Sequence, residues 1–175
     1  MRNNINYQIL SVEEQELWSL TEVKNYLRVA HKNDDKLIAS LISSAIISAE
    51  QFLGISFFIK KVSCVIDKAP NCLRLRYIPI ASVAKVSLIT DDDEEDITEG
   101  FGYVDFNNQK IWIAQKYLYK NLVINYEAGL GEKIPRTILH GILMHIGMMY
   151  DFGENLVNIS SEIKEIYLPY RALKI

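Results

Sequence analysis

The spacing of apolar residues changes twice along this chain, and no other feature of the sequence restricts its fold as strongly. Over residues 37–53 the apolar side chains recur every three or four positions, which is the spacing of one helical face. Between residues 57 and 127 they alternate instead, as in strands with one buried and one solvated face. Helical spacing returns over residues 138–150. We therefore predict an α+β fold of helix–helix–sheet–helix–helix order, in which a mostly antiparallel sheet is inserted into a bundle of N-terminal and C-terminal helices.

Capping residues indicate where the predicted helices begin and end. Ser19 and Glu22 are spaced as a capping box at the start of a short first helix. Gly54 follows the last apolar residue of the long second helix, where a left-handed C-cap is favoured. Pro135 suits the first turn of the third helix, because its missing N–H has no partner there in any case. Ser160, or the serine after it, suits the N-cap of a short final helix.

The alternating segment contains no connection long enough for a crossover helix, which favours antiparallel strands. Residues 103–106 and 110–113, joined by two asparagines, have the pattern of a hairpin. We expect a single domain, residues 1–175, built from three consecutive parts. These are the N-terminal helices at 19–54, an inserted β layer at 57–127, and the C-terminal helices and tail at 134–175.

The 175 residues are 49% hydrophobic and 23% charged, which is the composition of an ordinary soluble globular protein. A chain of this length buries about 70% of its unfolded surface, so it needs no disulfide or metal to fold. We interpret Cys64 and Cys72 as unreactive thiols in a reducing compartment; a disulfide between strands is an alternative, and a metal site a weaker one. No run of about 18 uninterrupted apolar residues predicts a membrane span, and residues 1–10 lack the pattern of a signal peptide.

Seven of the 22 acidic residues lie within residues 91–100. The rest of the chain has 19 Lys and Arg against 15 Asp and Glu, a balance of +4, so the formal charge of −3 describes a mildly basic chain with one acidic segment. We interpret the segment as a solvated hairpin tip, because it lacks the alternating ligands and central glycine of a calcium loop. A cation site is the alternative. This acidic tip comprises Asp91, Asp92, Asp93, Glu94, Glu95 and Asp96.

A basic strip lies earlier in the β segment, where residues 60–85 hold six Lys and Arg and a single acid, Asp67. Such a strip is typical of a surface that faces nucleic acid or an acidic partner. No aromatic stacking platform alternates with these cations in the sequence, so an ordinary solvated sheet face is the other interpretation. The candidate DNA-facing residues are Lys60, Lys61, Arg74 and Arg76.

Motifs of catalysis and cofactor binding are absent from the sequence. It contains no GxxxxGK[ST] loop, no HExxH and no GxSxG, and its paired glycines lack the setting of a dinucleotide loop. His140 and His145 are five residues apart and do not share one helical face well, so we interpret His145 as a core or interface residue. We predict no catalytic residue, no cofactor and no metal. A small enzyme is an alternative that rests only on a metal held by the acidic tip.

Several segments, in their order and spacing, resemble the tailed-phage head–tail connector (head-completion) family, which is found in phages, prophages and gene transfer agents. One is a capped helix followed by a polar acidic loop and a long helix that ends in Ala-Glu-Gln-Phe-Leu-Gly. The others are the exit from the sheet, Tyr-Glu-Ala-Gly before Ile-Pro and a long helix, and the closing Leu-Pro-Tyr-Arg. The residues that carry the resemblance are 20–28, Asp34, Asp35, 37–45, 49–54, 126–129, Ile134, Pro135 and 168–171.

The resemblance implies a structural protein and not an enzyme. Copies would form a ring under the portal protein, extend the DNA channel, and present a platform to a stopper or tail-completion protein. DNA would pass through the channel non-specifically, and no membrane would be involved. The protein would be in the host cytoplasm during assembly and afterwards in the virion neck. The acidic tip would face either the DNA channel or a basic patch on a neighbouring copy.

Members of this family bind the portal through C-terminal segments, and the resemblance extends this role to the tail of this chain. An alternative is that the final helix folds back on the protein's own core. The alternative function for the whole chain is a small nucleic-acid-binding module that uses the basic strip. The candidate portal or neighbour interface comprises Ile163, Ile166, Tyr167, Tyr170, Arg171, Leu173 and Ile175.

Overall fold

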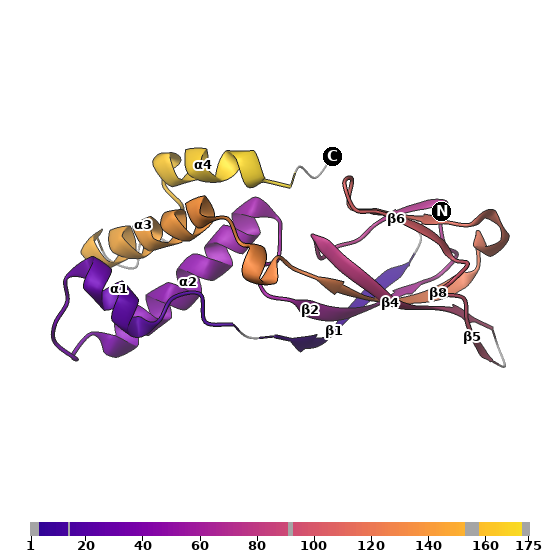
Figure 1. Ribbon diagram of the computed structural model, residues 1–175, viewed down its shortest axis with the longest axis horizontal. Helices are drawn as coiled ribbons and strands as arrows, with labels where there is room; N and C mark the ends of the chain where they lie inside the picture. Colours follow the sequence, from indigo (N-terminus) through magenta and orange to yellow (C-terminus); the bar gives the residue numbers. More distant parts are fainter. Residues whose placement is uncertain (1–3, 14, 91–92, 153–157, 173–175) are drawn as a thin grey trace. The chain divides into compact units, whose positions relative to one another are not determined.

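The computed structural model describes residues 4–13, 15–90, 93–152 and 158–172 (Figure 1). Its helices and strands follow the order predicted from the sequence, except that a strand at Ile5–Val12 precedes the first helix. The predicted α+β class is confirmed, because the described chain combines four α-helices, which come before and after the central strands, with antiparallel sheets. The chain divides into two units. A strand unit is formed by residues 1–14 and 56–131, and a helical unit by residues 15–55 and 132–175.

The strand unit contains two sheets instead of one, and every pairing between the described strands is antiparallel. The smaller sheet includes the predicted hairpin, which is β6 paired with β7. The larger sheet has the order β1 (Ile5–Val12), β2 (Lys60–Ile66), β8 (Asn121–Ala128), β4 (Ile80–Ile89) and β5 (Glu94–Asp96). The smaller sheet has the order β3 (Cys72–Arg74), β7 (Lys110–Ile113) and β6 (Gly102–Asp105), and the 3₁₀ turn η1 (Gln115–Tyr117) comes after β7 in the chain.

The two edge strands of the larger sheet were missed by the sequence prediction. In β1 the apolar residues do not alternate along the whole strand, since Ile9 and Leu10 are adjacent. The pairing register with β2 shifts at the same place, between Ile9 and Ser11. β5 consists of three consecutive acidic residues, a composition that strand propensity disfavours. An edge strand is held by one neighbour and faces solvent on its other side, so its sequence needs less of the periodic pattern than a central strand does.

Alternate side chains of the strand unit form one apolar core. Residues that face each other across β2 and β8 are buried in pairs, namely Val62 with Tyr126, Cys64 with Ile124, and Ile66 with Leu122. Leu73 and Ile111 of the smaller sheet pack against the same cluster. Each fully buried aliphatic side chain stabilises the fold by about 1.5–3 kcal/mol. The core therefore fixes the strand register, because a slip by one residue would turn this whole row toward solvent.

Glycine at position 102 allows the β6–β7 pair to close. Gly102 has a φ of 139°, and a Cβ at this position would lie 1.9 Å from the carbonyl oxygen of Trp112. A side chain there would collide with the neighbouring backbone, which cannot move aside without breaking the pair. The hairpin therefore requires, besides the alternating pattern, a residue without a side chain at position 102, the first residue of β6.

The helical unit contains α1 (Leu20–Leu27), α2 (Asp35–Leu53), α3 (Arg136–Phe152) and α4 (Ser161–Tyr167); the 3₁₀ turn η2 (Gly131–Lys133) precedes α3, and η4 (Leu168–Tyr170) follows α4. The predicted caps at Ser19, Gly54 and Ser160 are confirmed, whereas Pro135 directly precedes α3 and does not lie in its first turn. Ser19 Oγ accepts a hydrogen bond from the Glu22 N–H at 3.2 Å, and Glu22 Oε2 accepts from the Ser19 N–H at 2.9 Å. Gly54 ends α2 with a φ of 71°. Ser160 caps α4, since its Oγ accepts from the Ile163 N–H at 3.4 Å.

Within this unit α2 and α3 pack along their predicted apolar faces. By length and composition α2 is also apolar enough to cross a membrane, which the sequence reading did not predict for any segment because polar residues interrupt the apolar run. Its buried residues nevertheless recur every three or four positions, which is the pattern of a helix in a protein core. These residues are Ile38, Leu41, Ala45, Ile46, Ala49 and Leu53.

Candidate functional site

The final helix packs against α3 through two side chains of the predicted interface. Ile163 and Tyr167 are both fully buried in the structure. The Tyr167 ring covers Gly141 of α3, where a Cβ would lie only 2.5 Å from Tyr167 Cε1. For these two residues the structure therefore corresponds to the alternative interpretation, a final helix folded back on its own core. Ile166 is half-buried on the same helix.

The described end of the chain is attached to the C-terminal end of α2. The Arg171 guanidinium lies over the Phe52 ring, with 4.9 Å between its Cζ and the ring centroid. The Ala172 N–H donates a hydrogen bond to the Leu53 carbonyl oxygen at 2.8 Å, which satisfies one of the open carbonyls at the end of that helix. Tyr170 remains 37% exposed. The predicted interface residues Leu173 and Ile175 lie outside the described residues.

A charged cluster, which the sequence reading did not single out, holds the loop before α2. Lys24 Nζ lies 2.5 Å from Asp35 Oδ1 and 2.6 Å from the His31 carbonyl oxygen. Tyr150 of α3 donates its hydroxyl to Asp34 Oδ2 at 2.6 Å, and this hydrogen bond is the main cause that raises the pKa of Tyr150. The adjacent acids Asp34 and Asp35 were the one sign of this cluster in the sequence. Their partners could not be predicted, because they come from α1 and α3 and lie up to 116 positions away.

The acidic tip is an edge strand in its described part, with its carboxylates bonded locally. Glu94 Oε1 accepts from Lys85 Nζ at 2.8 Å and from Ser87 Oγ at 2.7 Å, and the hydrogen bond from Lys85 is the largest cause of its lowered pKa. Asp96 Oδ1 accepts from the Thr98 hydroxyl at 2.6 Å, which lowers the pKa of Asp96. Asp91 and Asp92 lie outside the described residues. Among the residues that are described, no three His, Cys, Asp or Glu side chains are grouped to hold a metal ion.

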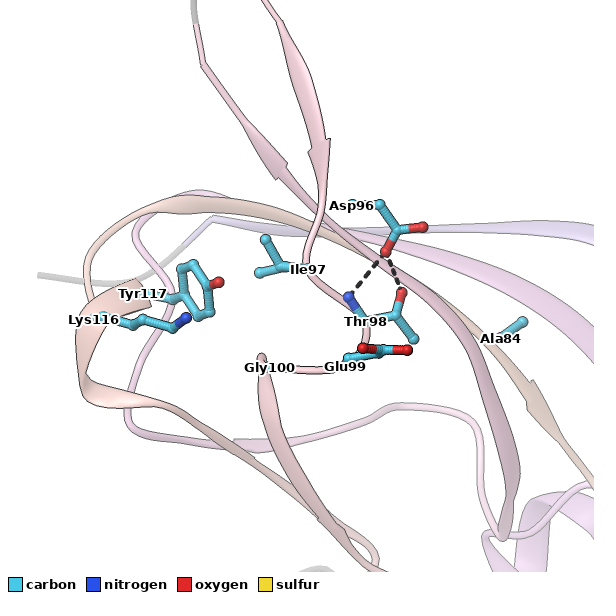
Figure 2. Close-up of a pocket in the computed structure, with 8 residues that line it drawn as sticks. All are labelled: Ala84, Asp96, Ile97, Thr98, Glu99, Gly100, Lys116 and Tyr117. Carbon is cyan, nitrogen blue, oxygen red and sulfur yellow. Dashed lines mark hydrogen bonds between the residues drawn. The ribbon is translucent and has the colours of Figure 1, made fainter.

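A hollow of about 540 Å³ adjoins the acidic tip (Figure 2). Asp96, Thr98 and Glu99 line one part of it, and Lys116 and Tyr117 of η1 line another. Lys116 Nζ lies 4.6 Å from the centroid of the Tyr117 ring. The lining offers two carboxylates and an ammonium group to a polar ligand but no arrangement of nucleophile and base.

The predicted DNA-facing residues do not form one continuous face. Lys60 and Lys61 are adjacent in β2 and therefore point to opposite sides of the sheet, and Lys61 Nζ lies 3.9 Å from Glu127 Oε1. Lys60 Nζ and Arg76 Cζ both approach the Tyr77 ring, at 5.8 and 5.5 Å from its centroid. Arg74 belongs to the other sheet. The structure thus gathers Lys60 and Arg76 at one place and separates Arg74 from them.

Strand pairing also brings aromatic residues beside Arg74, which the sequence reading did not anticipate. Tyr103 and Trp112 stack across β6 and β7 with 6.2 Å between ring centroids and an interplanar angle of 14°. Trp112 lies diagonal to Arg74 because β3 pairs with β7, although it follows Arg74 by almost forty residues in the chain, and Tyr103 lies one strand farther on the same side of the sheet. The signal available in the sequence was the alternation within the predicted hairpin, which places every second residue on the same face.

Comparisons with known proteins give one family and one fold. The family model described as "Head completion protein" matches residues 16–150. No curated protein sequence matches the chain. The fold is similar to a chain in the neck of an empty GTA particle computed with C6 symmetry, with a TM-score of 0.73, 13% identity, and 97% of each chain covered.

Two further structures show the same similarity of fold. A chain in the virion of a native gene transfer agent (GTA) particle has a TM-score of 0.75 and 12% identity over 97% of this chain and 96% of that one. A chain in the neck of a native GTA particle computed with C12 symmetry has a TM-score of 0.63 and 14% identity over 95% of this chain and 97% of that one.

Proposed function

The chain belongs to the head completion protein family, and we propose that it is a structural head–tail connector whose copies form a ring under a portal protein. The ring extends the DNA channel and joins the head to a stopper or tail-completion protein. DNA passes through it without sequence-specific contacts. In this role the protein is assembled in the host cytoplasm, becomes part of the virion neck, and performs no enzymatic reaction.

The family match over residues 16–150 is the observation that carries this proposal. It is supported by the similarity of fold to chains of GTA particles, which extends over nearly the whole of both chains. Two of those structures are necks computed with C6 and C12 symmetry, and cyclic symmetry is what a ring of identical copies requires.

The C-terminal segment is the part of this chain that we propose to bind the portal. Leu168 and Tyr170 are 54% and 37% exposed, an apolar pair at the surface beside Arg171. Arg171 is held by one cation–π contact with Phe52, which contributes about 0.5–1 kcal/mol at an exposed position. A portal surface that offers an aromatic ring or a carboxylate could replace this contact at little cost. Ile163 and Tyr167 support the segment from within the core.

Native mass spectrometry of the chain with its portal protein tests the proposal. We expect a complex that contains several copies of this chain per portal ring, whether or not the chain is monomeric alone. Substitution of Leu168 and Tyr170 by Ser should weaken the complex by about tenfold or more, since two exposed apolar anchors are lost. Substitution of Ile47, an exposed residue of α2, by Ser is the matched control. A chain that stays monomeric at high concentration both alone and with the portal contradicts the proposal.

Nucleic-acid binding is the second candidate function, and the convergence of Lys60 and Arg76 on Tyr77 is the observation that favours it. Two cations beside an aromatic ring can contact a phosphate backbone, and such binding weakens steeply with salt. The test is a salt titration of DNA binding, with charge reversal at Lys60 and Arg76, the two cations that approach Tyr77. Binding that is independent of salt or of both substitutions rejects this function.

A further inference from the structure

We propose that the acidic edge of one copy docks on the outer face of the smaller sheet of the next copy, head to tail. The inference rests on the proposed ring and specifies a contact within it. The receiving surface, called here the β3–β7–β6 face, is formed by Arg74, Lys110, Tyr103 and Trp112. The surface that it receives is the described acidic segment from Asp93 to Glu99.

The pairing register places the receiving side chains on one side of the smaller sheet. Trp112 lies opposite Tyr103, and Lys110 lies opposite Arg74, two positions farther along the same strands. The residue between them, Ile111, is fully buried on the other side. Tyr103 is 59% exposed, and Arg74 is exposed as well. The face therefore offers a stacked aromatic pair and an arginine, residue types enriched in protein interfaces, together with a second cation, Lys110.

One carboxylate shares this face but is already engaged. Asp105 pairs in register with Lys110, and its oxygens accept hydrogen bonds from Asn108 N–H at 3.0 Å and Asn108 Nδ2 at 2.8 Å. These bonds lower the pKa of Asp105 and keep its carboxylate directed at the β6–β7 turn. By formal charge, the side chains named on this face are two cations and one carboxylate.

The acidic segment has carboxylates to spare. Glu94 and Asp96 bind Lys85 and Thr98 within the same unit. Glu95 and Glu99 are exposed and make no hydrogen bond or ion pair with the part of the chain that the structure describes. Glu95 also points to the side of β5 opposite to Glu94, away from Lys85. These two side chains are the ones available to a partner.

The charge of the strand unit is divided in a way that suits contact between copies. Seven acids lie between residues 91 and 99, and the remainder of the unit, residues 1–14 and 56–131, has ten Lys and Arg against five Asp and Glu. One unit thus carries an acidic end and a body with a balance of +5. Two different, complementary surfaces on one unit generate a heterologous contact, and such a contact closes into a ring when the rotation between copies allows it.

Backbone pairing between sheet edges does not compete with this arrangement. β5 occupies one edge of the larger sheet, and its three consecutive carboxylates would repel a strand added there. The acidic edge is therefore suited to binding through its side chains. Opposite charges on two neighbours also set the register between copies and speed their encounter.

Cross-linking tests the contact directly, because Cys72 already stands on the receiving face opposite Trp112. In the variant Glu95→Cys, bound to the portal and treated with a short bis-maleimide, we expect a ladder of covalent multimers. Adding Cys72→Ser to this variant should abolish the ladder. The matched control is Gln51→Cys, an exposed position of α2, which should give no ladder above background. Products that stop at dimers indicate a two-fold contact and overturn the proposal.

Charge reversal gives a second readout that does not depend on cysteine chemistry. Arg74→Glu with Lys110→Glu should lower the yield of multimers by about tenfold or more, and so should Glu95→Lys with Glu99→Lys. Mixing the two double variants should restore assembly, because the reversed surfaces match each other again. Lys36→Glu with Arg136→Glu, two exposed positions of the helical unit, is the control and should assemble normally.

The outcomes separate this contact from the ring itself. If the unsubstituted chain forms multimers on the portal but Glu95→Cys cross-links no better than Gln51→Cys, only the head-to-tail contact is wrong. If the unsubstituted chain forms no multimers at all, the proposed function fails. If reversal at Arg74 and Lys110 weakens DNA binding and leaves assembly intact, the face belongs to nucleic acid and the proposal is overturned.

Discussion

At the scale of single residues, the attachment of α4 to α3 depends on the side chain of Tyr167. Tyr167 is fully buried, and its hydroxyl has no hydrogen-bond partner within the described chain. A buried polar group without a partner costs about 1–3 kcal/mol. The position is nevertheless filled by a large ring, because Gly141 leaves a notch on α3 of matching size. The contact between α3 and α4 thus combines close packing with a local cost.

Removing that hydroxyl should stabilise the protein. We expect Tyr167→Phe to raise the free energy of unfolding by about 1 kcal/mol, because the ring stays in place and the unpaired group is lost. Gly141→Ala should lower it by about 1–3 kcal/mol, because the added methyl group overlaps the ring. Urea denaturation with circular dichroism measures both changes. Equal stability of Tyr167→Phe and the unsubstituted protein would mean that the hydroxyl finds a partner in solution.

The two cysteines should differ sharply in reactivity. Cys64 is fully buried between the strands, and this burial raises the pKa of its thiol to about 11. Because the thiolate is the reactive form, Cys64 should remain almost inert at pH 8, where nearly all of it is protonated. Cys72 is only half-buried. We expect Ellman's reagent to modify one thiol rapidly in the folded protein and both in urea, and Cys72→Ser to remove the rapid phase. Two equally fast thiols in the folded protein would contradict this assignment.

At the scale of elements, sequence and structure agree best where a local rule determines the result. Capping chemistry needs only residues three positions apart, and the capping box at Ser19 and the N-cap at Ser160 form as expected. The long stripes of α2 and α3 were predictable because burial of one face imposes a period of 3.6 residues. β1 and β5 were missed for the opposite reason. Whether a segment becomes an edge strand depends on the neighbouring strand that it pairs with, and this pairing cannot be recognised from the segment's own sequence.

The attachment of β5 to β4 should depend on pH. Hydrogen bonds from Lys85 and Ser87 lower the pKa of Glu94 below its ordinary value of 4.5. The folded protein therefore binds this proton less readily than the unfolded chain does. The stabilisation is complete above the ordinary value and is lost as the pH falls below it through the lowered pKa. We expect the protection of the β5 amides against hydrogen exchange, taken relative to the intrinsic rate at each pH, to fall in that range before the protection of β2 and β8 does.

A neutral variant separates this effect from general acid unfolding. Glu94→Gln should exchange faster in β5 at neutral pH and should lose the additional pH dependence, because it has no carboxylate to protonate. Glu95→Gln is the matched control, since Glu95 makes no bond to Lys85. A pH profile of β5 that is identical in the unsubstituted protein and in Glu94→Gln would refute the role of the Lys85–Glu94 pair.

At the scale of the whole molecule, the class of fold could be predicted from the sequence, but the candidate surfaces could not. The order of helices and strands follows from two changes in the apolar period. The division into two sheets does not, because it depends on which strands pair. The pairing of β7 with β6 follows from the hairpin pattern, but its pairing with β3, which lies far earlier in the chain, does not. Surfaces depend on these pairings. Arg74, expected beside Lys60, instead stands beside Trp112 and Tyr103, which is why the basic strip in the sequence is not one surface in the protein.

If the proposed ring forms, we expect the charge of the chain to affect the assembled particle most at the acidic tip. In the proposed ring, it either lines the channel, where it repels DNA and lets it slide, or binds the positive face of a neighbour.

We expect replacement of the six acids from Asp91 to Asp96 by Asn and Gln to reduce assembly on the portal by about tenfold if the neighbour contact holds. Particle yield and DNA retention, measured separately, distinguish the two roles. Normal assembly with altered DNA retention would assign the tip to the channel, and normal results in both measurements would exclude both roles. The same six positions are a more informative target than the cations, because Lys60, Lys61, Arg74 and Arg76 are divided among different surfaces, whereas the six acids are consecutive in the sequence.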